Sequence, residues 1–147
     1  MKPIQFADGI TLLNLNPFNY ALKNDYINNL MNTGMCILPI VADTVVGDIS
    51  IKKCFTSKKQ FLNNDYEKED PRLSDKFSEG LAIRLTWDEY DANMATQLAY
   101  RVMSQLELKM NIAINNTANH ITFYLDTDDQ SIYEITPDNS KRIIKKY

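Results

Sequence analysis

LTWDEYDANMA, residues 85–95, joins a short apolar run to the longest helical pattern in the chain. Thr86 precedes Glu89 by three residues, the spacing of a capping box, in which each side chain bonds the backbone N–H of the other residue. Leu85 and Tyr90 stand at the positions of the hydrophobic staple that often accompanies such a start. The stretch therefore predicts that a helix begins here, and helix initiation accounts for its clustered carboxylates.

The predicted helix extends over about 87–110. Its apolar side chains recur every fourth residue and so share one face: Met94, Leu98, Val102, Leu106 and Met110. Trp87 is the single tryptophan, and it falls at the first helical position and off that face. We therefore expect the row to face a core, and we take Trp87 as a contact residue for a partner if it is exposed.

Upstream, the sequence predicts a hairpin followed by another helix. Residues 4–15, IQFADGITLLNL, hold two apolar runs around an Asp-Gly pair that suits a type I′ turn. Residues 16–34, NPFNYALKNDYINNLMNTG, carry apolar side chains at four-residue spacing and finish on Gly34, a residue typical of helix ends. They predict a helix over about 17–33.

Two strands are expected next. Residues 35–43, MCILPIVAD, form a continuous apolar run rich in branched side chains, which is typical of a buried strand. Pro39 cannot donate to a sheet ladder, so it implies an edge position or a bulge. Residues 44–55, TVVGDISIKKCF, alternate well enough to predict a second strand.

The remaining apolar segments also predict strands. LAIRLT at 81–86 is short, while HITFYLD at 120–126 and SIYEIT at 131–136 alternate and are separated by a polar turn, so we expect a hairpin. KRIIKKY at 141–147 is a final basic strand or tail. The order of elements predicts an α+β fold.

We therefore expect a largely antiparallel sheet of about five to seven strands packed against two main helices, at about 17–33 and 87–110. A chain of 147 residues is most simply one domain, 1–147. A charged insertion at about 56–80 interrupts it, with few aliphatic residues. It is either functional or mobile, with a short helix at each end.

The composition is that of an ordinary globular protein, with 44% apolar residues and a net charge of −3. The N-terminus lacks the apolar core of a signal peptide, and no apolar run is long enough to span a membrane. A cytoplasmic location with no membrane partner is expected. Cys36 and Cys54 are interpreted as reduced core residues, although a disulfide between neighbouring strands stays open.

Catalytic and metal signatures are weak. One histidine, His120, and two separated cysteines cannot make a four-ligand zinc site without recruiting carboxylates. The four glycines are scattered, so no phosphate-binding loop is expected. We expect neither cofactor nor metal, and the chain is interpreted as leaning away from catalysis.

The leading hypothesis is a non-catalytic protein-binding module. Small, acidic, cytoplasmic α+β proteins are common among bacterial immunity proteins and phage inhibitors, which occlude a toxin or a defence enzyme. The expected contact surface is the charged insertion, with aromatic anchors and acidic residues that steer a basic partner. The predicted contact residues are Tyr66, Glu67, Glu69, Asp70, Phe77 and Trp87.

Three alternatives stay open. A self-assembling component, such as a phage virion or assembly protein, would use the terminal strand to extend a neighbour's sheet, and a homodimer is compatible with the sequence. An enzyme with an unrecognised carboxylate site is another. Nucleic-acid binding is less favoured because the chain lacks a basic excess, but two basic clusters would serve it: Lys52, Lys53, Lys58 and Lys59, and Lys141, Arg142, Lys145 and Lys146.

Overall fold

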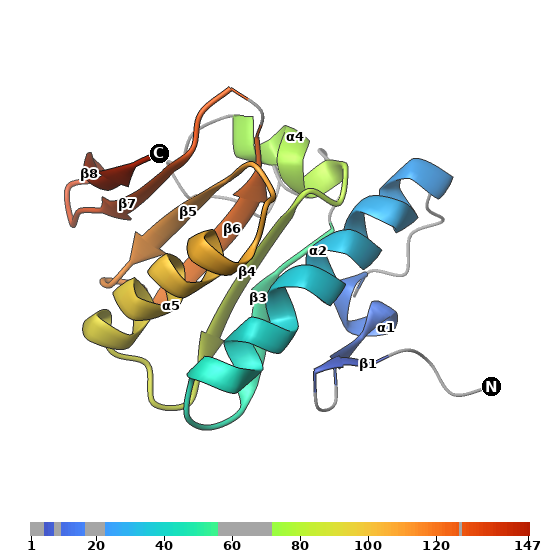
Figure 1. Ribbon diagram of the computed structural model, residues 1–147, viewed down its shortest axis with the longest axis horizontal. Helices are drawn as coiled ribbons and strands as arrows, with labels where there is room; N and C mark the ends of the chain where they lie inside the picture. Colours follow the sequence, from blue (N-terminus) through green and yellow to red (C-terminus); the bar gives the residue numbers. More distant parts are fainter. Residues whose placement is uncertain (1–4, 8–9, 17–22, 56–71, 127) are drawn as a thin grey trace.

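The computed structural model describes residues 5–7, 10–16, 23–55, 72–126 and 128–147. Six strands form one sheet in the order β3-β4-β6-β5-β7-β8 (Figure 1). Neighbouring strands are antiparallel except β5 and β7, which run parallel. The strands are β3 (Ile49–Lys53), β4 (Ala82–Trp87), β5 (Met110–Asn115), β6 (His120–Leu125), β7 (Ser131–Ile135) and β8 (Lys141–Lys146).

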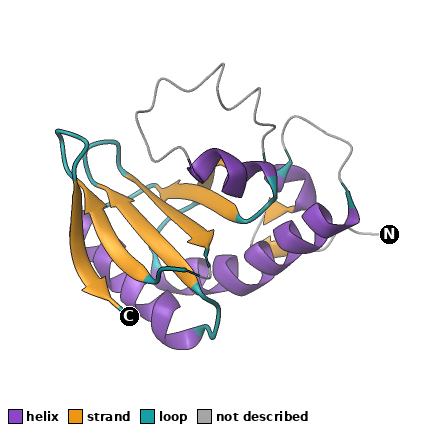
Figure 2. Cartoon of the chain, turned by 90° about the horizontal axis from the view of Figure 1, so that it is seen from above, coloured by secondary structure: helices purple, strands orange, loops and turns teal. Residues whose placement is uncertain are grey.

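Helices cover both faces of this sheet. The two long helices, α2 (Asn24–Thr44) and α5 (Ala92–Gln105), lie side by side on one face, and α4 (Arg72–Ser78) packs on the other (Figures 1 and 2). A small ribbon of β1 (Gln5–Ala7) and β2 (Ile10–Thr11) precedes α1 (Leu12–Leu15). The predicted α+β class is confirmed. The N-terminal hairpin is confirmed only in part, because β1 and β2 pair but residues 12–15 of its second run form α1. Of the short helices expected at the two ends of the insertion, α4 forms at the second end, and the first end lies outside the described residues.

The core is divided by the sheet, because successive side chains of a strand point to opposite faces. The face below α2 and α5 carries the larger cluster, which includes Ile83, Leu85, Ile112, Ile114, Phe123 and Ile132. On the opposite face, Leu73 and Phe77 of α4 pack against Ala82, Ala113, Tyr124 and Tyr133. Each long helix therefore buries one stripe, and the sheet buries both sides.

The expected strand at 35–43 is wrong, because α2 continues through it to Thr44. The buried residues of α2 follow helical spacing: Leu30, Thr33, Gly34, Ile37, Leu38 and Val41. Pro39 lies on the exposed side of the helix, where its missing N–H is tolerated more easily. Gly34 is a site of close packing rather than a helix end, since a Cβ there would lie 2.9 Å from Phe6 Cδ2.

The expected helix start at Thr86 is also wrong. β4 extends to Trp87, and Thr86 pairs with Ser50 of β3, so the capping box does not form. Helix α5 begins five residues later than Trp87, at Ala92, where the Asp91 carboxylate accepts a hydrogen bond from the Met94 N–H at 2.8 Å. Threonine and tryptophan favour strands, and pairing with β3 outweighs the local capping pattern.

The far end of the same helix was placed too late. Helix α5 ends at Gln105, and β5 begins at Met110. This strand lies inside the sheet and was not predicted, because Met110 continues the four-residue spacing of the helix. Met110 and Ile112 are fully buried in the larger cluster. The regular spacing of apolar residues thus ran from one element into the next.

The predicted hairpin between 120–126 and 131–136 does not form, although both strands exist. β6 pairs with β4 and β5, and β7 pairs in parallel with β5. The connection crosses the start of β5, where the Asn111 amide donates to the Asp129 carbonyl at 2.9 Å and accepts from the Ser131 N–H at 2.9 Å. A buried asparagine therefore fixes this crossing.

Candidate functional site

The residues predicted for partner contact do not come together on one described surface. Tyr66, Glu67, Glu69 and Asp70 lie outside the described residues, as do Lys58 and Lys59 of the first basic cluster. Phe77 and Trp87 are described, and both are buried, with exposed fractions of 0% and 3%. The exposure on which the selection of Trp87 depended is therefore absent.

Phe77 and Trp87 instead support the fold. The Trp87 ring lies 4.7 Å from the Tyr90 ring, centroid to centroid, beneath the start of α5. Its Nε1 is buried and has no hydrogen-bond partner among the described residues. The Phe77 ring has the Lys53 ammonium at 5.7 Å and the Arg84 guanidinium at 5.6 Å from its centroid. Aromatic rings stabilise cations at such distances.

The described residues of the two basic clusters lie at opposite edges of the six-stranded sheet. Lys52 and Lys53 belong to β3 and the other cluster belongs to β8, the first and last strands of the order. These described residues do not form one continuous binding face. The β8 edge is the better candidate, because its basic residues are all described and all exposed: Lys141, Arg142, Lys145 and Lys146.

Exposed apolar surface gathers at the same edge. Five large apolar or aromatic side chains are exposed in the described part of the chain, and three of these lie on or beside β8: Tyr100, Ile143 and Tyr147, at 40%, 49% and 48% exposure. Lys145 sits between the two tyrosines, with its ammonium 5.9 Å from the Tyr100 centroid and 4.7 Å from the Tyr147 centroid. We call Tyr100, Lys145 and Tyr147 the aromatic clamp.

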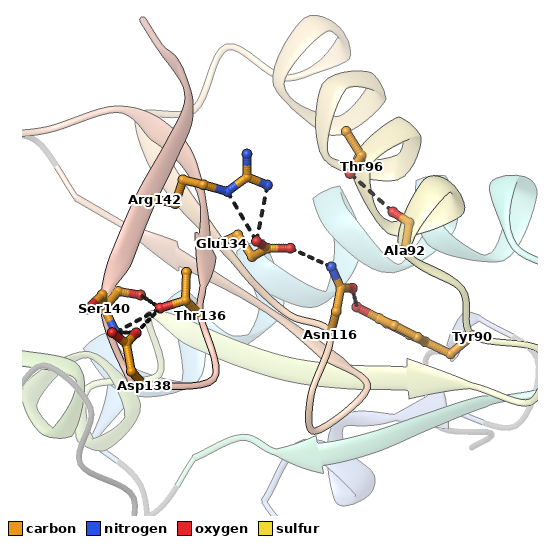
Figure 3. Close-up of polar contacts among 9 residues, drawn as sticks. All are labelled: Tyr90, Ala92, Thr96, Asn116, Glu134, Thr136, Asp138, Ser140 and Arg142. Carbon is orange, nitrogen blue, oxygen red and sulfur yellow. Dashed lines mark hydrogen bonds and ion pairs between the residues drawn. The ribbon is translucent and has the colours of Figure 1, made fainter.

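A chain of polar contacts anchors β8 to the rest of the molecule (Figure 3). Arg142 donates through Nε and Nη2 to Glu134 Oε1, at 3.2 and 3.1 Å. The other carboxylate oxygen, Oε2, accepts from the Asn116 amide at 2.8 Å, and Asn116 Oδ1 accepts from the Tyr90 hydroxyl at 2.7 Å. These hydrogen bonds connect four residues from two strands and two turns.

The hydroxyl at the inner end of this chain stays protonated. Burial raises the pKa of Tyr90 well above the usual range, and the nearby Glu134 and Asp91 charges raise it further. A neutral hydroxyl is the donor that the Asn116 carbonyl oxygen requires. We therefore assign Tyr90, Asn116 and Glu134 a positioning role at the edge.

Of the four basic residues of β8, only Arg142 belongs to this polar chain, and the three lysines do not. Arg142 is paired with Glu134, whereas Lys141, Lys145 and Lys146 have no acidic partner within the described segments. Lys141 lies 4.2 Å from the centroid of the Tyr133 ring on the other side of the strand. The edge thus presents positive charge on both of its faces, next to exposed apolar groups.

Other chemistry receives less support from the described residues. A shallow depression of about 400 Å³ lies where β4, β5 and β6 meet one end of the sheet, lined by Lys76, Leu81, Glu107, Leu108, Lys109, Leu125 and Asp126. Its two lysines are balanced by two carboxylates, so it selects for neither charge. Within the described ranges, no cluster of three or more ligating side chains could hold a metal ion.

The cysteines are both free, in agreement with the interpretation as reduced residues. Cys54 is buried, and burial raises the pKa of its thiol to about 12, so it is a poor nucleophile at neutral pH. Cys36 lies half-buried on α2. No described Asp or Glu side chain is buried.

Tyr100 was missed by the sequence prediction. It lies on α5 but off the buried row that includes Leu98 and Val102, so its exposure could have been read from the helical period. Its position beside Lys145 could not, because that contact depends on where β8 sits in the sheet. No known protein family, curated protein or solved structure shows a detectable match to this chain.

Proposed function

We propose that this chain is a protein-binding module that contacts its partner through the β8 edge. The observation that carries the proposal is the gathering of Tyr100, Ile143 and Tyr147 at a sheet edge that also presents three lysines with no acidic partner among the described residues. Exposed tyrosines are typical anchors of protein interfaces, because they bury large area with few torsions to restrain. The polar chain from Arg142 to Tyr90 supports this role, since its hydrogen bonds connect β8 to β7 and to the turns that carry Asn116 and Tyr90.

The charge of the sheet edges favours a different protein as partner over copies of this chain. Antiparallel pairing of β8 with a second β8 would set lysines and arginine opposite one another, and like charges placed directly across a ladder are destabilising. Pairing of β8 with β3 of another copy would meet the same obstacle at Lys52. Self-assembly into a phage virion or assembly component is therefore the second candidate.

Among protein-binding modules, we propose the inhibitor or immunity class, in which a small cytoplasmic protein of bacterial or phage origin occludes a toxin or defence enzyme. Size, the acidic net charge of −3 and the α+β fold support this assignment. No described helix combines the length and apolarity needed to cross a bilayer.

The proposal is tested by site-specific photo-cross-linking in the cells that make the protein. The photoreactive residue p-benzoylphenylalanine replaces Tyr100 in one variant and Met35 in a matched control, whose side chain is 55% exposed on α2. We expect a discrete protein adduct from the Tyr100 position and little from the Met35 position. Equal yields from the two positions, or an adduct between two copies of this chain, would contradict the proposal.

A further inference from the structure

We infer that the β8 edge takes an acidic, extended polypeptide segment, whose carboxylates meet Lys141, Lys145 and Lys146. This inference rests on the proposed function and specifies the chemistry of the partner. Its basis is charge complementarity at the edge, because none of these lysines has an acidic partner in the described part of the chain. Complementary charge is the main source of selectivity at such polar surfaces.

The position of β8 in the sheet favours an extended segment. β8 pairs with β7 on one side only, so the backbone N–H and C=O groups on its outer side can accept another strand. The register shifts between Ile132 and Tyr133, so β8 carries a bulge around Ile144. Lysines and bulges of this kind prevent unwanted edge pairing. An acidic segment reverses the effect of the lysines and so is selected over neutral or basic strands.

The aromatic clamp adds apolar contact to the same partner. Tyr100 and Tyr147 flank the Lys145 stem, and their half-exposed rings can cover the aliphatic part of an acidic side chain that reaches the ammonium. Ile143, about half exposed, pairs with Tyr133, whereas Lys145 pairs with Ile132 on the other side of the bulge. Because Tyr133 and Ile132 point to opposite faces of β7, Ile143 and Lys145 also lie on opposite faces of β8. A strand added to β8 places alternate side chains over each of these two faces.

A single-stranded nucleic acid would also use lysine and stacking tyrosines. Its affinity depends on neutralising many phosphates in succession, whereas this edge supplies only three uncommitted lysines on a chain of net charge −3. A nucleic acid would make no backbone hydrogen bonds to the outer N–H and C=O groups of β8 and no side-chain contact with Ile143. A polypeptide satisfies all of these features, so the observations favour it.

The test is a fluorescence anisotropy titration of the full chain with three labelled probes. The first is a peptide of about eight residues in which pairs of Glu alternate with pairs of Thr, so that an extended chain places carboxylates over both faces of β8. The second has Gln in place of every Glu, and the third is an oligothymidylate of similar length. At about 0.05 M ionic strength, where surface charges are weakly screened, we expect the Glu peptide to bind about tenfold more tightly than either other probe.

Charge reversal at the two sheet edges provides the matched control. Lys145→Glu is expected to weaken binding of the Glu peptide about tenfold, and Lys145→Gln by less. Lys52→Glu changes the net charge equally, but it lies on β3 and should alter the affinity by less than about twofold. Both lysines are exposed, so we expect each variant to fold. Thermal unfolding followed by circular dichroism verifies this.

The outcomes separate the two proposals. If Tyr100 cross-links to a protein in cells while the Glu peptide binds no better than the Gln peptide, the inference is overturned and the proposed function stands. Preferred binding of the oligothymidylate, or an equal loss from Lys52→Glu and Lys145→Glu, would also overturn the inference. Failure to obtain any adduct at Tyr100 would remove the basis of both.

Discussion

Asp91 is expected to hold the N-terminus of α5, and its removal should destabilise the protein measurably. Its carboxylate accepts a hydrogen bond from the Met94 N–H at 2.8 Å. Replacement of such a cap by alanine costs about 1 kcal/mol. For a chain of this size that corresponds to a decrease of about 2–4 °C in Tm. We therefore expect Asp91→Ala to lower both the urea midpoint and Tm.

Two matched variants separate this cap from the sequence-based alternative. Asp91→Asn keeps an oxygen acceptor and should retain most of the stability, because asparagine caps helices as well as aspartate. Glu89 is exposed in the turn after β4, so Glu89→Ala, which would remove the capping box, should change the free energy of unfolding by less than about 0.5 kcal/mol.

Urea unfolding followed by the fluorescence of Trp87, and separately by circular dichroism, measures these changes. Trp87 is a suitable reporter because it is the single tryptophan and is buried against Tyr90. If Glu89→Ala lowered the urea midpoint more than Asp91→Ala, the helix would begin at the capping box after all. That result would refute the placement of α5.

Three further changes test the helix, the polar chain and the thiols. Pro39→Ala should raise the free energy of unfolding, measured by urea titration, by about 1–3 kcal/mol, because proline inside a helix is about 3 kcal/mol less favourable than alanine; a lower free energy would contradict the continuity of α2. Tyr90→Phe leaves the Asn116 oxygen without its donor and should cost about 1–2 kcal/mol of unfolding free energy, whereas an unchanged midpoint would argue against the polar chain. Because burial raises the pKa of Cys54 to about 12, a thiol reagent at about pH 8 should label Cys36 alone in the folded protein, as read by mass spectrometry. The stability that Cys54 contributes as a neutral thiol is complete below the pKa of the unfolded thiol and is lost as pH rises toward 12, so Cys54→Ala should reduce the alkaline loss.

Local patterns predicted most of the strands and the class of fold, because alternation and turn residues are local signals. These patterns failed where the spacing of apolar residues continued from one element into the next. The apolar spacing of the row from Met94 to Met110 crosses the end of α5 and enters β5, so the row alone could not show where the helix ends. The capping pattern at Thr86 is locally sound, yet pairing with Ser50 of β3 decides its conformation.

Residues 35–43 show the opposite failure. A run of branched apolar side chains fits a buried strand, but the same residues place Ile37, Leu38 and Val41 on one helical face against the sheet. Pro39 complicated the strand interpretation, because proline cannot donate to a sheet ladder, and it is also rare inside helices, so it indicated neither element. Its exposed position on α2 is a property of the tertiary structure that local sequence does not encode.

The candidate site could not be predicted without knowing the order of the strands in the sheet. The basic character of β8 is visible in the sequence, and so is the exposed side of α5 that carries Tyr100. Their proximity follows from β7 pairing in parallel with β5, which places β8 at the end of the sheet. The expected hairpin with β6 would have sent the same lysines to a different edge.

The parallel pairing of β7 with β5 has a consequence for synthesis of the chain. While the ribosome still holds residues 131–147, β5 can pair only with β6, so the hydrophobic strand beginning at Met110 remains an open edge. β7 can cover that edge only after residues 131–135 have left the ribosome. We therefore expect a chain truncated after Gln130 to aggregate during expression, and a monodisperse truncated protein would contradict this order of events.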